Sequence, residues 1–211
     1  MSKHVDVMTG LQNRKALELF LTERVEREEP VSLALLDVDH FMEINVQHGN
    51  EVGDKVLQVL AGLMQADASF HVFRVSGDEF AVALSDSSLE HAFLQMEKLR
   101  ARVEGATEQF GLPEGQGVTI TIGVAQYPRD AKKVEALNQA ASAALMSAKE
   151  IGRNQVSLPP NEEMIMKSCY YPSTMTRKLK ALAEQLKKKE SALLREALED
   201  LLRKYDRAAA K

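Results

Sequence analysis

The sequence predicts an α/β domain over residues 1–158, with helices flanking a central sheet, and a smaller helical module over residues 164–211. Segments with apolar residues at helical spacing alternate with short apolar runs typical of strands, and this alternation predicts the α/β class. Pro159 and Pro160 then interrupt the pattern, so that residues 159–163 are expected to be a linker.

The predicted order is helix, strand, helix, hairpin, helix, strand, helix and strand. Val31–Asp37 is an almost continuous apolar run, as in a strand buried on both faces. The turn Ser76–Glu79 contains a glycine and separates two short apolar runs, which predicts a β-hairpin. The other expected elements are helices at 13–28, after Gly53, at 89–110 and at 134–151, hairpin strands at 70–75 and 80–84, and strands at 118–125 and 154–158.

Composition favours a cytoplasmic protein with no membrane segment. Of the 211 residues, 45% are hydrophobic, enough for a substantial core, yet the apolar runs are far too short to span a bilayer. The N-terminus lacks the apolar stretch of a signal peptide. The single cysteine, Cys169, excludes an intrachain disulfide framework and fits a reducing compartment.

Charge is unevenly distributed along the chain. The net charge of −4 divides into −8 for residues 1–160 and +4 for residues 161–211. A basic module behind an acidic domain predicts that any polyanion binds to the C-terminal part. A solvated helical face rich in Lys and Glu would give the same balance, and charge alone leaves both interpretations open.

Acidic residues stand at the ends of two predicted strands. Asp37 and Asp39 follow the buried strand, and Asp78 and Glu79 lie in the hairpin turn. If these strands are neighbours in one sheet, the carboxylates meet and repel one another unless a cation lies between them. Mg²⁺ is the divalent ion that such oxygen ligands suit best. Alternatively, Asp37 caps the next helix and Asp78 only serves the turn, and spacing alone does not choose between the two.

Five segments resemble the motifs of the GGDEF diguanylate cyclase family, whose fold is similar to that of nucleotide cyclases and polymerase palms. The closest is Arg74–Phe80, which reads Arg-Val-Ser-Gly-Asp-Glu-Phe. The other four are Asp6–Arg14, Asp37–Asp54, Thr119–Ala125 and Ala148–Asn154. Together they cover nearly all of residues 6–157 in the family's order, so the resemblance concerns the whole first domain.

The resemblance implies a catalytic and metal site. Asp37 and Asp78, with the Val38 carbonyl, would hold Mg²⁺ (or Mn²⁺) on the triphosphate of GTP, and Glu79 would lie near the attacking ribose hydroxyl. The implied substrate-binding residues are Phe41, Asn45, Asp54, Lys149 and Arg153, of which Asn45 and Asp54 would bind guanine and the two cations would neutralise phosphate. A carboxylate that accepts from two base N–H groups selects guanine, because adenine does not offer that pair of donors.

The implied reaction condenses two GTP molecules into cyclic di-GMP and releases pyrophosphate, in a homodimer whose two domains each bind one nucleotide. Met42 and Ser76 replace the family's usual lysine and glycine, and the family's usual product-inhibition motif is absent from residues 67–70. Loss of one charged phosphate contact weakens binding by about 1.5–3 kcal/mol. These departures keep an alternative open, in which a weakened domain senses GTP or a cyclic dinucleotide for a transcription regulator.

The C-terminal module resembles the ribbon-helix-helix family. The pattern is a short strand before Pro172, a helix from Ser173, a turn at Lys187–Glu190 and a second helix. The resemblance implies a dimer whose paired strands enter the major groove of duplex DNA. The implied DNA-binding residues are Lys167, Ser168, Tyr170, Lys188 and Lys189, with Cys169 and Tyr171 facing the core. One long dimerising helix over residues 173–206, with no nucleic-acid role, is the alternative.

Overall fold

The computed structural model of the protein describes residues 4–113, 115–160 and 171–186, together with residues 188–191, 193, 194, 196–198, 201 and 204. The chain divides into two compact units, a first unit Met1–Glu163 and a second unit Met164–Lys211. Among the described residues, no helix has the length and apolar character needed to cross a membrane.

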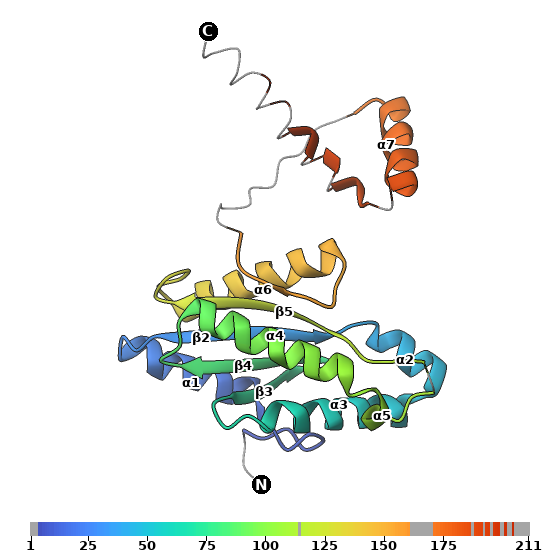
Figure 1. The fold of residues 1–211 in the computed structure, drawn as a ribbon. Coiled ribbons are helices and arrows are strands. Elements are labelled where there is room, and N and C mark those ends of the chain that lie inside the picture. The colour runs from blue at the N-terminus through green and yellow to red at the C-terminus, as the bar shows by residue number, and fades with distance from the viewer. Residues whose placement is uncertain are drawn as a thin grey trace. The chain divides into compact units, whose positions relative to one another are not determined.

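The first unit alternates helices and strands in the predicted order (Figure 1). Its helices are α1 (Arg14–Glu26), α2 (Phe41–His48), α3 (Asn50–Gln65), α4 (Leu89–Gly105), α5 (Thr107–Phe110) and α6 (Val134–Ile151). Its strands are β1 (Gln12–Asn13), β2 (Val31–Val38), β3 (His71–Ser76), β4 (Glu79–Ser85), β5 (Ile120–Tyr127) and β6 (Val156–Ser157).

The six strands form one mixed sheet in the order β1-β3-β4-β2-β5-β6. The four central strands are antiparallel to their neighbours, whereas the short edge strands β1 and β6 pair in parallel with β3 and β5. The buried strand predicted at Val31–Asp37 is therefore β2, which lies between β4 and β5 and carries the first acidic motif to one end of the sheet.

The sheet has a hydrophobic core on each face. Alternate residues of β2 point to opposite faces, so that Ala34 and Leu36 pack with α3 and α4, while Val31 and Leu33 pack with α1 and α6. Helix α6 approaches the sheet closely at Gly123 of β5, where a Cβ atom would collide with the backbone of α6. The first unit thus buries both faces of its sheet within one chain.

Several predicted boundaries were wrong. The segment after Asp39 forms α2, a helix with no buried residue, which the sequence did not predict. The helix expected over 89–110 ends at Gly105 and is followed by the single turn α5. The two-residue strand β1 was not predicted, and β5 runs to Tyr127 rather than Ala125.

The described part of the second unit is helical. Helix α7 (Ser173–Leu186) begins directly after Pro172, as predicted, and ends before Lys188 and Lys189, which are not helical. Helical residues resume at Glu190, and Leu193 N donates to Lys189 O over 3.2 Å. The alternative of one uninterrupted helix over residues 173–206 is therefore wrong.

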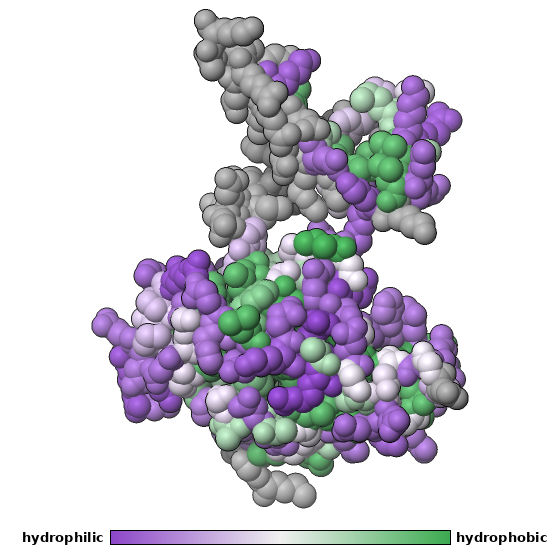
Figure 2. Space-filling view, in the orientation of Figure 1, coloured by the Kyte–Doolittle hydropathy of each residue, from purple (hydrophilic) through white to green (hydrophobic). Residues whose placement is uncertain are grey.

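The second unit leaves apolar side chains exposed. Ala183 and Leu193 are its buried apolar residues within the described part. Its exposed apolar side chains are Met175, Leu182, Leu186, Leu194, Leu198 and Leu201. Figure 2 shows apolar surface on α7 bordered by hydrophilic side chains. Tyr171, expected to face the core, is also exposed in the single chain, and the predicted strand at 164–170, with Lys167, Ser168, Cys169 and Tyr170, lies outside the described residues.

Candidate nucleotide and metal site

The β2–β4 pairing brings the acidic residues of two motifs to one end of the sheet. In the antiparallel register, Asp37 of β2 lies opposite Glu79, the first residue of β4. The Val38 N–H donates to the Asp78 carbonyl oxygen over 3.3 Å, which holds the hairpin turn against the end of β2. Asp37, Asp78 and Glu79 therefore belong to one acidic cluster, although they come from segments about 40 residues apart.

Lys149 of α6 neutralises part of this cluster. Its Nζ atom lies 2.7 Å from Asp37 Oδ2, and the Asp37 side chain is only 13% exposed. Burial raises the pKa of the Asp37 carboxyl above its ordinary value; the Lys149 ammonium opposes that rise, and the Asp78 and Glu79 carboxylates add to it. The site therefore has unfavourable negative charge at Asp37 that a second cation would relieve.

A network behind the hairpin fixes its turn. The Arg74 guanidinium donates to the Gly77 carbonyl oxygen through Nε (3.2 Å) and through its second terminal nitrogen (2.8 Å). Its other terminal nitrogen lies 3.0 Å from Asp6 Oδ1. Burial alone would raise the pKa of Asp6, but hydrogen bonds from Thr9 and Arg74 lower it below the ordinary value. Arg74 thus connects the N-terminal motif to the turn that carries Asp78.

Two departures from the family's motif have visible consequences. The Ser76 hydroxyl donates to Glu79 Oε2 over 2.7 Å, a contact that glycine could not make. The Met42 side chain, at the position of the family's lysine, is 79% exposed and supplies no charge. Of the two cations predicted to bind phosphate, Lys149 pairs with Asp37, while the Arg153 guanidinium makes no hydrogen bond to a described residue.

The acidic cluster suits a magnesium ion held jointly with phosphate. Across the described residues, no three His, Cys, Asp or Glu side chains come close enough to bind one ion. Mg²⁺ in phosphate-binding sites takes one or two carboxylates and completes its octahedron with water and phosphate oxygens. Asp37, Asp78 and the Val38 carbonyl would supply a donor set of this kind, and Mn²⁺ accepts the same oxygen ligands.

Asp39, which the sequence places beside Asp37, is not part of the acidic cluster. Its side chain is buried and accepts hydrogen bonds from Thr119 Oγ1 (2.7 Å), Thr121 Oγ1 (2.5 Å) and the Asn154 N–H (3.1 Å). With its two oxygens so occupied, Asp39 serves to tie β2 to β5 and to the turn after α6. Of the two aspartates, the family resemblance assigned the metal to Asp37 alone, but nothing in the sequence predicted the hydrogen-bonding partners of Asp39.

The residues predicted to bind guanine lie where α2 packs on α3. Gly49, with φ of 88°, separates the two helices, and Asn45 of α2 faces Gly53 of α3. A Cβ atom on Gly53 would collide with Asn45 Oδ1 and crowd Phe41, so a larger residue there would displace the Asn45 side chain. Asp54 follows Gly53 and is exposed to solvent, where a ligand can reach its carboxylate.

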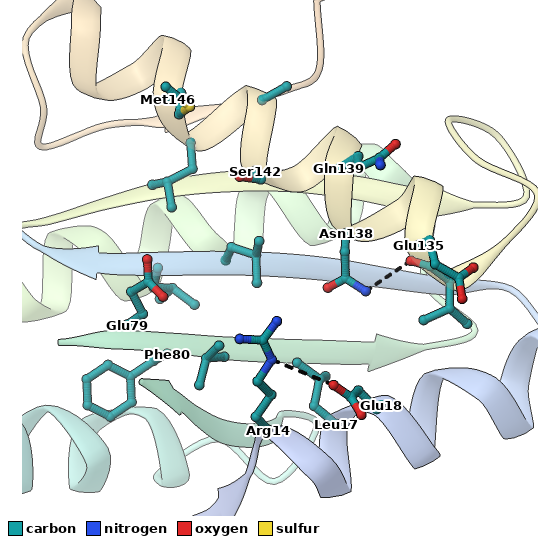
Figure 3. Close-up of a pocket in the computed structure, with 16 residues that line it drawn as sticks. Arg14, Leu17, Glu18, Glu79, Phe80, Glu135, Asn138, Gln139, Ser142 and Met146 are labelled. Atoms are coloured by element: carbon teal, nitrogen blue, oxygen red, sulfur yellow. Dashed lines mark hydrogen bonds and ion pairs between the residues drawn. The ribbon is translucent and has the colours of Figure 1, made fainter. Parts of the chain in front are cut away.

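A groove of about 680 Å³ opens beside the acidic cluster, between α1 and α6 (Figure 3). Leu35, Val75 and Phe80 line it with apolar surface, and Glu79 lies at its wall. Arg14 also lines the groove and pairs with Glu18 over 3.6 Å. Of the predicted nucleotide and metal residues, only Glu79 lines this groove, so the predicted triphosphate site lies at its edge and not inside it.

A sheet that presents carboxylates from its central strand and from a neighbouring hairpin, with cations nearby, places the first unit among α/β nucleotide-cyclase domains. Residues 3–155 match the sequence model of the family described as diguanylate cyclase, GGDEF domain. The chain belongs to this family. Residues 170–206 match the ribbon-helix-helix domain, which confirms the predicted two-part architecture.

Curated relatives share the first unit. Diguanylate cyclase DgcP of Pseudomonas aeruginosa is 36% identical over 162 residues, which cover 72% of this chain and 23% of the relative. Diguanylate cyclase DosC of Escherichia coli K12 is 32% identical over 167 residues, covering 75% of this chain and 36% of the relative. The chain therefore spans less than half the length of these relatives.

Solved structures confirm the fold. The GGDEF domain of DgcB from Caulobacter crescentus, in complex with c-di-GMP, superposes with a TM-score of 0.65 at 27% identity, covering 74% of this chain and 96% of that chain. The GGDEF domain of PA1120 from Pseudomonas aeruginosa gives a TM-score of 0.64 at 30% identity, covering 73% of this chain and 99% of that chain.

Proposed function

We propose that this protein is a diguanylate cyclase that condenses two GTP molecules into cyclic di-GMP as a homodimer. The observation that carries the proposal is the β2–β4 register, which sets Asp37 opposite Glu79 with the Asp78 turn held against Val38. Two carboxylates and a carbonyl at one strand end, beside a lysine, suit a triphosphate bound with a divalent cation.

Each residue has a distinct role in the proposed reaction. Lys149 and Arg153 bind phosphate oxygens, and Asn45 and Asp54 bind the guanine edge. A divalent cation held by Asp37 and Asp78 would spread the negative charge that develops during phosphoryl transfer. Glu79 accepts the proton of the attacking 3′-hydroxyl as its oxygen bonds to the α-phosphorus of the other GTP, while the bond to the leaving pyrophosphate breaks.

The reaction requires two half-sites. One domain binds one GTP, so the two nucleotides meet only when two domains face each other about a two-fold axis. The second unit supplies the means, because its exposed apolar residues suit a symmetric dimer. Ribbon-helix-helix dimers bind duplex DNA, and the net charge of +4 over residues 161–211 fits that role.

The first experiment is a product assay with GTP and Mg²⁺. Wild-type protein is expected to release cyclic di-GMP and pyrophosphate, and Asp78→Asn is expected to lower the turnover at least a hundred-fold, since a ligand of the cation is lost. Asp86→Asn is the matched control, because Asp86 is a turn aspartate at the other end of β4 and its φ of 51° is tolerated by Asn. Equal turnover in wild type and Asp78→Asn would refute the proposal.

A second function, nucleotide sensing without turnover, is favoured by the Ser76–Glu79 hydrogen bond, which engages one carboxylate oxygen of the proposed proton acceptor. Ser76→Gly distinguishes the two functions. Under the sensor hypothesis, wild type binds GTP without product formation, and Ser76→Gly frees Glu79 and restores turnover. Under the cyclase hypothesis, wild type already forms product.

DNA binding is tested separately by fluorescence anisotropy with a random duplex. Affinity is expected to fall steeply as salt rises, because binding releases counterions from the phosphates. Lys188 is a weak candidate contact, since its Nζ atom pairs with Glu196 over 2.9 Å, whereas Lys189 is exposed. Absence of binding at low salt would leave the second unit with dimerisation alone.

A further inference from the structure

The turn that carries Arg153 has an unusual backbone. Gly152, Arg153 and Asn154 have φ angles of 154°, 63° and 44°, three consecutive positive values of which two belong to residues with side chains. Such conformations persist only where the surrounding structure enforces them, and they concentrate at functional sites. Here the strained residue is the proposed phosphate ligand, so the contacts that enforce the turn also determine where the Arg153 side chain leaves the backbone.

The sheet holds one side of this turn. The Asn154 N–H donates to Asp39 Oδ2 and to Thr121 Oγ1, each over 3.1 Å. Asp39 is buried and also accepts from Thr119, so its carboxylate is fixed by three residues of two other segments. Since Asp39 stands two residues beyond Asp37 in the chain, the turn is anchored to the same strand end that carries the acidic cluster.

Helix α4 holds the other side. A terminal nitrogen of Arg100 donates to Asn154 Oδ1 over 2.9 Å, and Asn154 Nδ2 donates to Glu104 Oε1 over 2.9 Å. Arg100 and Glu104 pair with each other over 2.8 Å, which closes a three-membered network around the Asn154 amide. Glu97, on the same helix, accepts from the Val156 N–H over 3.2 Å. Both polar ends of the Asn154 side chain are thereby satisfied by α4.

We propose that Asn154 is a positioning residue that sets the Arg153 guanidinium for the triphosphate, with Asp39 and the Arg100–Glu104 pair as its supports. This inference rests on the proposed function, in which Arg153 binds phosphate. Since no described residue accepts a hydrogen bond from the Arg153 guanidinium, the backbone of residues 152–154 is what fixes the Cα–Cβ bond from which this side chain starts. Asp39 accordingly acts through the turn, and its role differs from that of Asp37.

The decisive variant is Asn154→Gly. Glycine adopts a φ of 44° without strain, so the backbone conformation can be retained while both side-chain contacts with α4 are lost. Affinity for GTP is expected to fall roughly ten-fold, the effect of weakening one charged phosphate contact. Affinity for guanosine, which has no phosphate, is expected to stay unchanged. Glu90→Gln is the matched control, because it breaks another ion pair of α4, with Arg129.

A double-mutant cycle separates positioning from general stability. Once Arg153→Ala has removed the guanidinium, Asn154→Gly should cause no further loss of GTP affinity. Additive losses, or equal losses for GTP and guanosine, would show that Asn154 acts on the domain as a whole and would overturn the inference.

A second measurement does not depend on nucleotide binding. In the chain without nucleotide, Arg100→Met should accelerate amide hydrogen exchange at residues 152–154 while leaving the exchange of β2 and β4 unchanged. Unchanged exchange at the turn would overturn the positioning role even if GTP binds. Failure of the wild-type protein to bind GTP would refute the proposed function instead, and the exchange experiment would still decide whether α4 holds the turn.

Discussion

The two units of the chain differ in where their apolar surface is buried. The first unit covers both faces of a six-stranded sheet with its own helices, and residues such as Leu21, Leu33 and Leu60 have no exposed surface. The described part of the second unit buries only Ala183 and Leu193 and leaves larger side chains such as Leu198 55% exposed. A module of this size rarely builds a sufficient core alone. The first unit therefore has its core within one chain, whereas the exposed apolar residues of the second fit the dimer proposed above.

The largest expected effect comes from removing the second unit. A chain that ends at Leu158 keeps both cores of the first unit and should fold and bind GTP with unchanged affinity. Its turnover at micromolar concentration should fall at least a hundred-fold, because two half-sites then meet only by diffusion. Calorimetry measures the affinity and product analysis measures the turnover. Turnover that is undiminished and independent of protein concentration would show that the second unit is not needed to bring the two half-sites together.

A single substitution on α7 tests whether the second unit mediates dimerisation without removing that unit. Leu182→Glu should weaken the dimer roughly a hundred-fold or more, since two leucines lose about 1.5 kcal/mol each of burial and two charges would be desolvated. Leu94→Glu is the control, because Leu94 is 58% exposed on α4 of the first unit. Sedimentation velocity across a dilution series distinguishes monomer from dimer, and an unaltered dimer in Leu182→Glu would place the interface elsewhere.

The contrast between the units also shows what the sequence could predict. Apolar periodicity predicted α6 with its observed bounds and placed β2 within one residue, because both bury continuous apolar surface. Helix α2 was missed because it buries no residue and depends on its contact with α3 at Gly53. The local apolar pattern thus predicts helices and strands that carry a buried apolar face. It fails for an element such as α2, whose formation depends on contact with another segment.

The candidate site follows the same rule. Asp37, Asp78 and Glu79 could be predicted because each ends a recognisable strand or turn within a known motif, and the register brings them together. The hydrogen bond between Asn154 and Asp39 joins residues 115 positions apart, and the sequence around either residue gives no indication of its partner. Arg100 lies outside every motif, on a helix whose spacing shows only that it is amphipathic.

A substitution with a smaller expected effect, at the Asp6–Arg74 ion pair, tests whether the first unit is stabilised within one chain. Asp6→Asn leaves the Arg74 guanidinium, only 11% exposed, without its counter-ion and should lower the free energy of unfolding by about 1–3 kcal/mol. Asp67→Asn is the control, because Asp67 accepts similar hydrogen bonds from the Ser69 N–H and hydroxyl but has no guanidinium within bonding distance. The loss should be the same in the full chain and in the chain ending at Leu158, and independent of protein concentration.

The Asp6 effect should also depend on pH in a defined direction. The folded pKa of Asp6 lies below its ordinary value of 3.8, so its contribution is fully present above that value and is lost as the pH falls through the folded pKa. Urea unfolding should therefore show a constant difference between wild type and Asp6→Asn above about pH 5, and a shrinking one below about pH 4. A difference that grows in acid would contradict the role of the ion pair.

The smallest expected effect concerns nucleotide affinity, which a single half-site should determine. Met42→Lys places an ammonium at an exposed position beside the proposed triphosphate site and should raise GTP affinity about three- to ten-fold, with solvent screening limiting the gain. Val46→Lys is the control, because Val46 lies one turn further along α2 and is 81% exposed. If affinity belongs to one half-site, Met42→Lys acts equally in the full chain and in the chain ending at Leu158. A gain confined to the full chain would show instead that the partner domain contributes to the nucleotide site, and that the first unit, although folded alone, is functionally incomplete.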